Sequence, residues 1–219
     1  IAVAYLLLFL VRWLLSLIYY KKGKSDVTDF PENLFTVVQP ILSGDPRLES
    51  DLRANLQQTK TVEFYWLIDQ SDTEAQRVAN KICQDELFSQ RIRIFLIEDV
   101  PQGINPKSYK IEQVVEDLTR PYLIVLDDDS VIDFSKMGEL TAYLGQEVIL
   151  TGIPYNQERS NFWSKLVAAF VNGNSLITYF TMAQVEANHS INGMFYILPV
   201  NLVKDQDLFT AIKDLSLIH

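Results

Sequence analysis

The chain is poor in cysteine and histidine, and it has no stretch rich in basic residues. Among its 219 residues there is one cysteine, Cys83, so no internal disulfide can form, which fits a reducing compartment. Two histidines, His189 and His219, are too few for a histidine-rich zinc site. A net charge of −9 without a basic stripe gives no reason to expect a nucleic-acid partner. The length suits one sizeable α/β domain plus a small extra element.

An apolar, leucine-rich run occupies residues 1–20, and its only charge is Arg12. About 20 apolar residues are enough to cross a bilayer as a helix. Lys21, Lys22 and Lys24 follow the run at once. By the positive-inside rule, these lysines place the rest of the chain in the cytosol. We therefore predict a transmembrane helix at residues 1–20 and a location at the cytosolic face of a membrane.

Arg12 is the objection to this prediction, because an arginine at the bilayer centre costs about 2.5–3.5 kcal/mol on insertion scales. If the helix begins upstream of the first residue, Arg12 moves toward the cytosolic interface, where it can snorkel beside Trp13, Tyr19 and Tyr20. A cleaved signal peptide fits less well, because the charge follows the apolar run and no small-residue cleavage site comes after it. The core helix of a soluble protein is the other alternative.

After a polar linker at residues 21–33, apolar runs alternate with helical patterns. Asp45-Pro46 is typical of a helix start, Ser71-Asp72-Thr73-Glu74 has the pattern of a capping box, and residues 107–118 have helical spacing. This alternation predicts an α/β domain over residues 34–219, with a mainly parallel sheet flanked by helices. Strands are predicted at residues 34–38, 64–68, 92–97, 122–126 and 148–150.

Three carboxylates, Asp127, Asp128 and Asp129, directly follow the predicted strand at residues 122–126. Their mutual repulsion raises their pKa values unless a cation lies among them. A hard divalent metal is the simplest such cation, although a solvated turn would also explain acids after a strand. An EF-hand-type calcium loop is excluded, because Ile132 stands where that loop needs glycine and Gly138 where it needs glutamate.

Glycine or polar residues follow each of the first four predicted strands. In open parallel sheets, ligands bind at the carboxyl ends of the strands, so these groups should converge on one site. Their convergence is stronger evidence for a ligand site than any one of the motifs. They are Gly44-Asp45, Asp69, the segment 103–107 and Asp127 to Asp129.

Three motifs carry a family resemblance: residues 39–46 (Gln-Pro-Ile-Leu-Ser-Gly-Asp-Pro), residues 103–107 (Gly-Ile-Asn-Pro-Lys), and the Asp-x-Asp of Asp127 and Asp129. Together they resemble the ceramide glucosyltransferase group of family-two glycosyltransferases, over most of the chain from about Leu34 on. The Asp-x-Asp alone is a weak signal, whereas the segment 103–107 is considerably more specific. The resemblance implies a membrane-anchored enzyme with a cytosolic, Rossmann-like catalytic domain of the GT-A fold.

The same resemblance implies metal-assisted, inverting transfer of a sugar from a UDP-sugar donor to a lipid acceptor such as ceramide. Asp69 would bind the base or ribose of the donor, although an acid at a helix start is the ordinary alternative. Asp127 would face the ribose and diphosphate, and Asp129 would hold Mg²⁺ or Mn²⁺, with Asp127 the second metal candidate. The ion is needed because negative charge grows on the diphosphate leaving group. Asp128 is expected to point the other way along the backbone.

Three further residues are candidates for donor binding. Lys107 could add positive charge at the phosphates or the acids, and Asn105 before Pro106 places a helix N-terminus with free N–H groups at the site. Asp45 is the third, but a helix cap would explain it fully. A lysine on a solvated helix is the plain alternative for Lys107.

The segment after Asp129 matches the family less closely. Residues 152–155 leave a strand near the expected acceptor side, and residues 192–195 resemble the family's short glycine-containing strand near the sugar pocket. The sequon at residues 188–190 would go unused in the cytosol. The family's acidic pair and Gln-x-x-Arg-Trp-type motif are absent after Phe195, so the catalytic base is expected beyond His219, in a longer protein.

Two other functions stay open. One is a haloacid-dehalogenase-type phosphatase, whose Asp-x-Asp signature residues 127–131 fit, although that motif belongs on the first strand of its domain and the later acidic pair is missing. The other is a nucleotide-sugar-binding or degenerate transferase without activity, which the missing base suggests.

Overall fold

The computed structural model describes residues 2–22, 29–157, 161–187 and 191–213. Parts of the predicted linker with Lys24, the sequon with His189, and His219 therefore lie outside the described residues. The chain forms two compact units, which we describe separately. The first comprises residues 1–26 and 151–192, and the second comprises residues 27–150 and 193–219. Predicting one domain over residues 34–219 did not anticipate that residues 151–192 group with the N-terminal helix.

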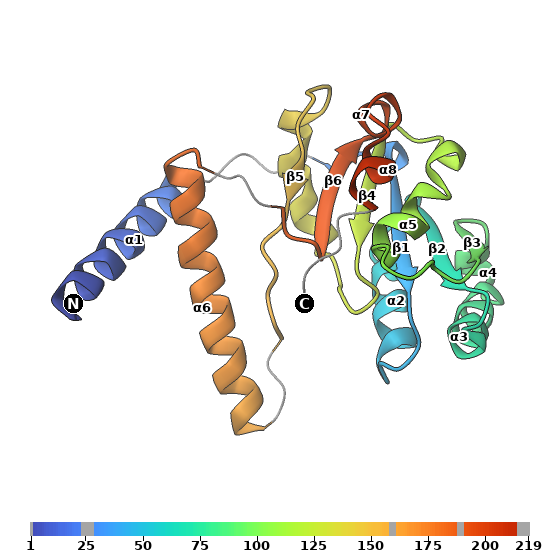
Figure 1. Ribbon diagram of the computed structural model, residues 1–219, viewed down its shortest axis with the longest axis horizontal. Coiled ribbons are helices and arrows are strands. Elements are labelled where there is room, and N and C mark those ends of the chain that lie inside the picture. The colour runs from blue at the N-terminus through green and yellow to red at the C-terminus, as the bar shows by residue number, and fades with distance from the viewer. Residues whose placement is uncertain (1, 23–28, 158–160, 188–190, 214–219) are drawn as a thin grey trace. The chain divides into compact units, whose positions relative to one another are not determined.

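A six-stranded sheet with the order β3-β2-β1-β4-β6-β5 confirms the α/β prediction (Figure 1). The first four strands pair in parallel, and β6 runs antiparallel to β4. The third and fourth strands have the predicted bounds, whereas the first two run to Ile41 and Asp69. The strands are β1 (Phe35–Ile41), β2 (Glu63–Asp69), β3 (Ile92–Ile97), β4 (Tyr122–Leu126), β5 (Leu150–Thr151) and β6 (Phe195–Pro199).

Short helices connect the strands. The prediction of a helix start at Asp45-Pro46 was wrong, because that helix begins at Leu48 and the Asp45 side chain accepts the Arg47 N–H in the preceding turn, at 2.8 Å. The helix predicted over residues 107–118 is broken into α5 and η2. The α-helices of this unit are α2 (Leu48–Gln57), α3 (Thr73–Cys83), α4 (Glu86–Ser89), α5 (Pro106–Glu112), α7 (Val200–Asp205) and α8 (Leu208–Lys213), and the 3₁₀ segments are η1 (Glu32–Leu34), η2 (Val115–Asp117) and η3 (Phe134–Tyr143).

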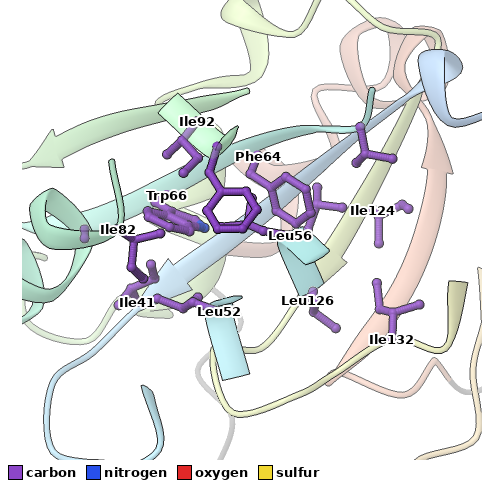
Figure 2. Close-up of a cluster of buried hydrophobic side chains, with 14 of the residues drawn as sticks. Ile41, Leu52, Leu56, Phe64, Trp66, Ile82, Ile92, Ile124, Leu126 and Ile132 are labelled. Atoms are coloured by element: carbon purple, nitrogen blue, oxygen red, sulfur yellow. The ribbon is translucent and has the colours of Figure 1, made fainter. Parts of the chain in front are cut away.

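The sheet buries both of its faces, because side chains alternate along each strand. On β2, Phe64 and Trp66 join one apolar cluster, and Tyr65 and Leu67 join the other. Helices α2 and α3 cover the first cluster, whose packing Figure 2 shows around Trp66. Helices α5, α7 and α8 contribute to the second cluster. The sheet is therefore the middle layer of three, and its strand ends are held rigidly from both sides.

Two long apolar helices make up most of the other unit: α1 (Ala2–Lys22) and α6 (Phe162–Gln184). Helix α1 confirms the predicted apolar N-terminal helix, and α6 was not predicted. Both are long and apolar enough to cross a membrane, with mean hydropathies of 2.1 and 1.2 over their most apolar windows. They pack against each other, and the ring centroids of Tyr19 and Phe180 lie 5.3 Å apart.

Candidate nucleotide-sugar site

The carboxyl ends of β1, β2 and β4 lie next to one another and are joined by polar contacts. Register places Val38 of β1 beside Val125 of β4 and Ile41 of β1 beside Ile68 of β2. Buried Gln39 accepts the Trp66 indole N–H at 3.1 Å and donates to the Asp127 carbonyl at 3.4 Å. The strand end that carries the acids is thus tied to the core beneath it.

Helix α5 carries two lysines that each pair with an acid at a strand end. The Lys107 ammonium bonds the Asp127 carboxylate and the Gly193 carbonyl, and it lies 5.7 Å from the centroid of the Tyr196 ring. The Lys110 ammonium lies 2.8 Å from the Asp69 carboxylate. Residues three apart project from the same side of a helix, so one turn of α5 supplies both cations. This arrangement brings the ends of β2 and β4 to a common helix.

The Lys110–Asp69 pair is the more buried of the two, since the Lys110 side chain is only 6% exposed. The second carboxylate oxygen of Asp69, Oδ1, is buried and has no hydrogen-bond partner among the described residues. A buried carboxylate oxygen of this kind is unfavourable unless something donates to it. Asp69 therefore offers an acceptor for a donor group of a ligand.

Asn105 begins α5 as its N-cap, as the sequence indicates. Its side-chain oxygen accepts the N–H groups of Lys107 and Ser108 at 3.0 and 3.2 Å. The expectation that these N–H groups are free for an anion was therefore wrong, because the cap occupies them. Gly103 precedes them with φ +86°, a backbone conformation that favours glycine. The segment 103–107 thus leads into α5 and places Lys107 in its first turn.

The three consecutive acids have different surroundings. Asp127 pairs with Lys107, whereas Asp128 accepts the Leu42 N–H at 2.7 Å, so these two point to different partners, as expected. Burial raises the pKa of Asp128, and the nearby charges of Asp129 and Asp127 add to the rise, although the Leu42 N–H opposes it. Asp129 is exposed, and within the described part of the chain its side chain accepts only a long 3.4 Å contact from the Ser130 hydroxyl. Asp129 is the most open carboxylate of the three.

The loop after β1 is fixed by acids from two other segments. Besides the bond from Leu42 to Asp128, the Ser43 N–H donates to Asp72 at 2.8 Å, and Asp72 is the N-cap of α3. The predicted capping box was wrong, because Asp72 is the N-cap, Ala75 stands where the box needs Glu or Gln, and Ser71 donates instead to Asp99. Asp45 lies in the turn beyond this loop, with local contacts to Arg47.

The donor set fits Mg²⁺ or Mn²⁺ as far as carboxylate oxygens go, because both ions prefer oxygen ligands. Among the described residues, however, no group of three or more Asp, Glu, His or Cys side chains forms a metal cluster. Asp129 is open, and Asp127 already has a lysine partner. Such an ion would therefore depend on oxygens from a ligand such as a diphosphate to complete its coordination.

Several residues of this site were not predicted from the sequence. Lys110, Gln39 and Asp72 were not predicted as site residues. Lys110 is three residues from Lys107 on a segment with helical spacing, Gln39 begins the motif at residues 39–46, and Asp72 lies in the predicted capping box. Tyr196 was missed as well. Its pKa is raised far above the usual tyrosine value, mainly because the hydroxyl is buried and also because the negative charge of Asp127 is near. The sequence does not indicate that Gln39 bonds both Trp66 and the Asp127 carbonyl, because that role depends on the register between β1, β2 and β4.

Comparison with solved structures supports the fold. The mannosyltransferase PcManGT from Pyrobaculum calidifontis, solved with GDP-Man and Mn²⁺, matches with a TM-score of 0.57 at 13% identity, over 90% of this chain and 55% of that one. TarS 1–349 from S. aureus matches at 0.48 with 13% identity, over 79% of this chain and 49% of that one. The chain thus spans about half the length of these proteins. No curated protein matches it in sequence.

The sheet order, the acids at the strand ends and the likeness to PcManGT agree on a GT-A-like fold. The family profile of glycosyl transferase family 21 matches residues 1–214, nearly the whole chain. That family is the ceramide glucosyltransferase family, so the resemblance seen in the sequence is confirmed, and the phosphatase alternative has no support. The chain belongs to glycosyl transferase family 21.

Proposed function

We propose that this chain binds a UDP-sugar at the carboxyl edge of the sheet, as the donor half of a membrane-anchored transferase that glycosylates a lipid at the cytosolic face. The observation that carries the proposal is the pairing of Lys107 and Lys110, on one turn of α5, with Asp127 and Asp69 at two strand ends. Cations and carboxylates arranged in this way suit a ligand with both hydrogen-bond donors and negative charge.

The two ends of this site have different chemistry. Asp69 is held through Oδ2 by buried Lys110, and its Oδ1, which has no partner among the described residues, accepts a hydrogen bond from the base or ribose of the donor. Lys107 and Asp127 face the ribose and diphosphate, where the ammonium offsets phosphate charge and the Asp127 carboxylate fixes the ammonium. Asn105 contributes by capping the helix that carries Lys107, and Asp45 by shaping the turn after β1.

Asp129 is the proposed ligand for Mg²⁺ or Mn²⁺, with Asp127 behind it. A divalent ion there neutralises the charge that grows on the departing diphosphate. PcManGT, which shares this fold, was solved with Mn²⁺ and a nucleotide sugar, and this supports the choice. Transfer with inversion also needs a carboxylate base, and none of the residues named above is assigned to that role.

UDP binding with and without Mn²⁺ tests the site. We expect Mn²⁺ to tighten UDP binding to the full chain in detergent, and Asp129→Ala to remove most of that gain. The loss in Mn²⁺ affinity should be at least about tenfold, because even outer-shell partners of metal ligands contribute that much. Isothermal titration measures both effects. Glu74→Ala, which removes an exposed acid on α3, is the matched control. Unchanged Mn²⁺-dependent affinity in Asp129→Ala would show that the metal assignment is wrong.

Membrane orientation needs its own measurement. A cysteine introduced at Lys22, in a Cys83→Ser background, should react with a membrane-impermeant thiol reagent only from the cytosolic side. Reaction from the opposite side would overturn the cytosolic assignment while leaving the nucleotide site untouched. The two experiments thus test the donor site and the topology independently.

A further inference from the structure

An apolar stripe runs along the N-terminal half of α6. It consists of Phe162, Trp163, Leu166, Val167 and Phe170, whose spacing places them on one side of the helix. Each is more than half exposed, and Trp163 and Phe170 are both 71% exposed. A contiguous apolar surface of this kind is unfavourable in water and indicates a binding surface.

The opposite side of α6 is occupied by the protein itself. Ala168 and Asn172 are buried there. The Asn172 side chain accepts the N–H of Asn156 at 2.8 Å and donates to its carbonyl at 3.0 Å, so the segment before α6 is attached to the middle of the helix. Lys165 also lies outside the stripe. Helix α6 therefore has one side attached to the protein and one uncovered apolar side.

The apolar side of α6 continues into its contact with α1. Arg12 of α1 donates to the Thr178 hydroxyl at 2.7 Å, and its carbonyl accepts from the Thr181 hydroxyl at 2.8 Å. These bonds satisfy polar groups of Arg12, the residue that fits poorly in a membrane helix. Figure 1 shows the two helices close at one end and spread at the other. Whatever solvent surrounds α1 therefore also reaches α6.

Where the helices separate, they leave an open groove of about 530 Å³. Tyr5, Leu6 and Phe9 line it from α1, and Phe170, Gly173 and Ile177 line it from α6. Phe170 belongs to both the groove and the stripe, so the two form one continuous apolar surface. Hydrocarbon chains of membrane lipid match this surface, because α1 is itself a membrane-length apolar helix whose side chains are mostly exposed.

Chain connectivity limits how α6 can meet a bilayer. It leaves β5 after Thr151 and returns to β6 at Phe195, and these strands are neighbours in one sheet. If α6 crossed the bilayer, residues 152–161 or 185–194 would have to cross it back, and ten residues are too few for a helix that spans it. Residues 156–161 also read Asn-Gln-Glu-Arg-Ser-Asn. A helix that enters and leaves on one side must lie along the interface.

We propose that α6 is an interfacial membrane helix, held against the anchor α1 by Arg12, whose apolar stripe and groove are covered by the acyl chains of bilayer lipid. This goes beyond donor binding, and it rests only on α1 being the membrane anchor. Its consequence is a second attachment of the chain to the membrane. Past α6 the chain reaches Gly193 and Met194, whose carbonyls bond Lys107 and the Asp127 N–H.

Depth-dependent fluorescence quenching tests the proposal on the full chain in phosphatidylcholine vesicles that contain lipids brominated at known acyl positions. The fluorescence of Trp13 is the difference between wild type and Trp13→Phe, and the fluorescence of Trp163 is the difference between wild type and Trp163→Phe. We expect Trp163 to be quenched most by bromines near the headgroup end of the acyl chain. The double change Leu166→Gln and Phe170→Gln should remove most of that quenching, whereas Lys165→Gln, outside the stripe, should retain it.

The outcomes separate the inference from the proposals on which it stands. If lipid bromines quench Trp13 but not Trp163, α1 is still the membrane anchor and the proposal for α6 is wrong. This holds both when aqueous iodide quenches Trp163 and when another part of the protein shields Trp163 from either quencher. If Trp163 is quenched most by the deepest bromines, the interfacial placement is wrong. If neither tryptophan is quenched, the anchor fails as well. UDP binding by the same variants in detergent should stay at the wild-type value, and a loss there would show that the substitutions damage the fold.

Discussion

Trp66 and Trp163 show how the two units of this protein differ. Trp66 is completely buried in the sheet, with its indole N–H bonded to Gln39, whereas Trp163 on α6 is 71% exposed. In the sheet unit, large apolar side chains form clusters on both faces and stabilise the fold. In the helical unit, similar side chains point outward. Large apolar side chains are thus buried in the sheet unit and exposed in the helical unit, where they form the surface proposed to contact lipid.

Polar groups differ between the units in the same way. The sheet unit buries Lys110 and pairs it with Asp69, while the helical unit pairs Arg12 with two threonines near exposed apolar side chains. An ion pair inside a protein must be complete, because a single buried charge is strongly unfavourable. Of the two threonine contacts, only the one with Thr178 involves the Arg12 guanidinium, because Thr181 donates to the Arg12 backbone carbonyl.

The largest expected effect is on folding of the sheet unit. Trp66→Ala should lower the free energy of unfolding by about 3–5 kcal/mol, because it leaves a cavity between β1, β2 and α3 and removes the partner of Gln39. Trp163→Ala should change it by no more than about 0.5 kcal/mol in detergent. Chemical denaturation of the full chain, followed by circular dichroism, measures both. Similar losses of unfolding free energy for Trp66→Ala and Trp163→Ala would show that the two tryptophans do not differ in their contribution to folding.

The next effect is on the buried ion pair. Lys110→Met should lower the free energy of unfolding by about 3 kcal/mol, because it leaves the Asp69 carboxylate buried without its cation. Lys81→Met is the matched control, since Lys81 also lies 2.8 Å from an acid, Glu49, but its side chain is 54% exposed. That exposed pair should contribute at most about 1 kcal/mol.

A second change on the partner of Lys110 sharpens this experiment. Adding Asp69→Leu to Lys110→Met should restore part of the lost stability, because both charges are then gone. UDP affinity of the double variant should be below that of wild type, since the proposed acceptor for the base or ribose is missing. If the double variant is no more stable than Lys110→Met, the loss comes from packing of α5 rather than from an unpaired charge.

Much of the fold could be predicted from the sequence, because the sheet strands are short apolar runs bounded by charge or turns. Strand β1 shows where such prediction stops. The predicted strand ended at Val38, before Gln39 and Pro40, and proline lacks the N–H that a central strand needs. The structure extends β1 to Ile41 because its pairing with β4 ends at Val38, so Pro40 pairs only with β2. That register is a tertiary property and leaves no local signal.

Helix α6 was missed for a different reason. Its hydropathy is well below that of α1, and polar residues such as Asn172, Asn174 and Thr178 interrupt the apolar pattern. These residues make sense only with their partners: Asn172 bonds the Asn156 backbone, and Thr178 bonds Arg12. For the site, the acids and Lys107 were found because they follow strands or carry a motif. Lys110 and Gln39 were not, because they act through burial and register.

The smallest expected effect is a difference in the pH dependence of two helix N-caps, one in each unit. Asp72 caps α3 and accepts the Ala75 N–H at 2.9 Å, and Asn161 caps α6 and accepts the Ser164 N–H at 2.7 Å. Replacing either by alanine should lower the free energy of unfolding by about 1 kcal/mol at neutral pH. Only the Asp72 effect should depend on pH. Burial raises the pKa of Asp72, but the N–H groups of Ala75 and Ser43 outweigh burial and bring it below the ordinary value.

Because the folded-state pKa of Asp72 is lowered, its ionised form contributes stability above the unfolded-state value of about 4, and this contribution is lost as the pH falls through the folded-state value. The difference between wild type and Asp72→Ala should therefore shrink below about pH 4, while the difference for Asn161→Ala should stay constant. Denaturation of the three proteins between pH 3 and 7 measures this. If the stability difference between wild type and Asp72→Ala does not change with pH, the ionised Asp72 carboxylate does not accept the Ala75 and Ser43 N–H groups. The side-chain contact that fixes the loop after β1 would then be the one with Asp128.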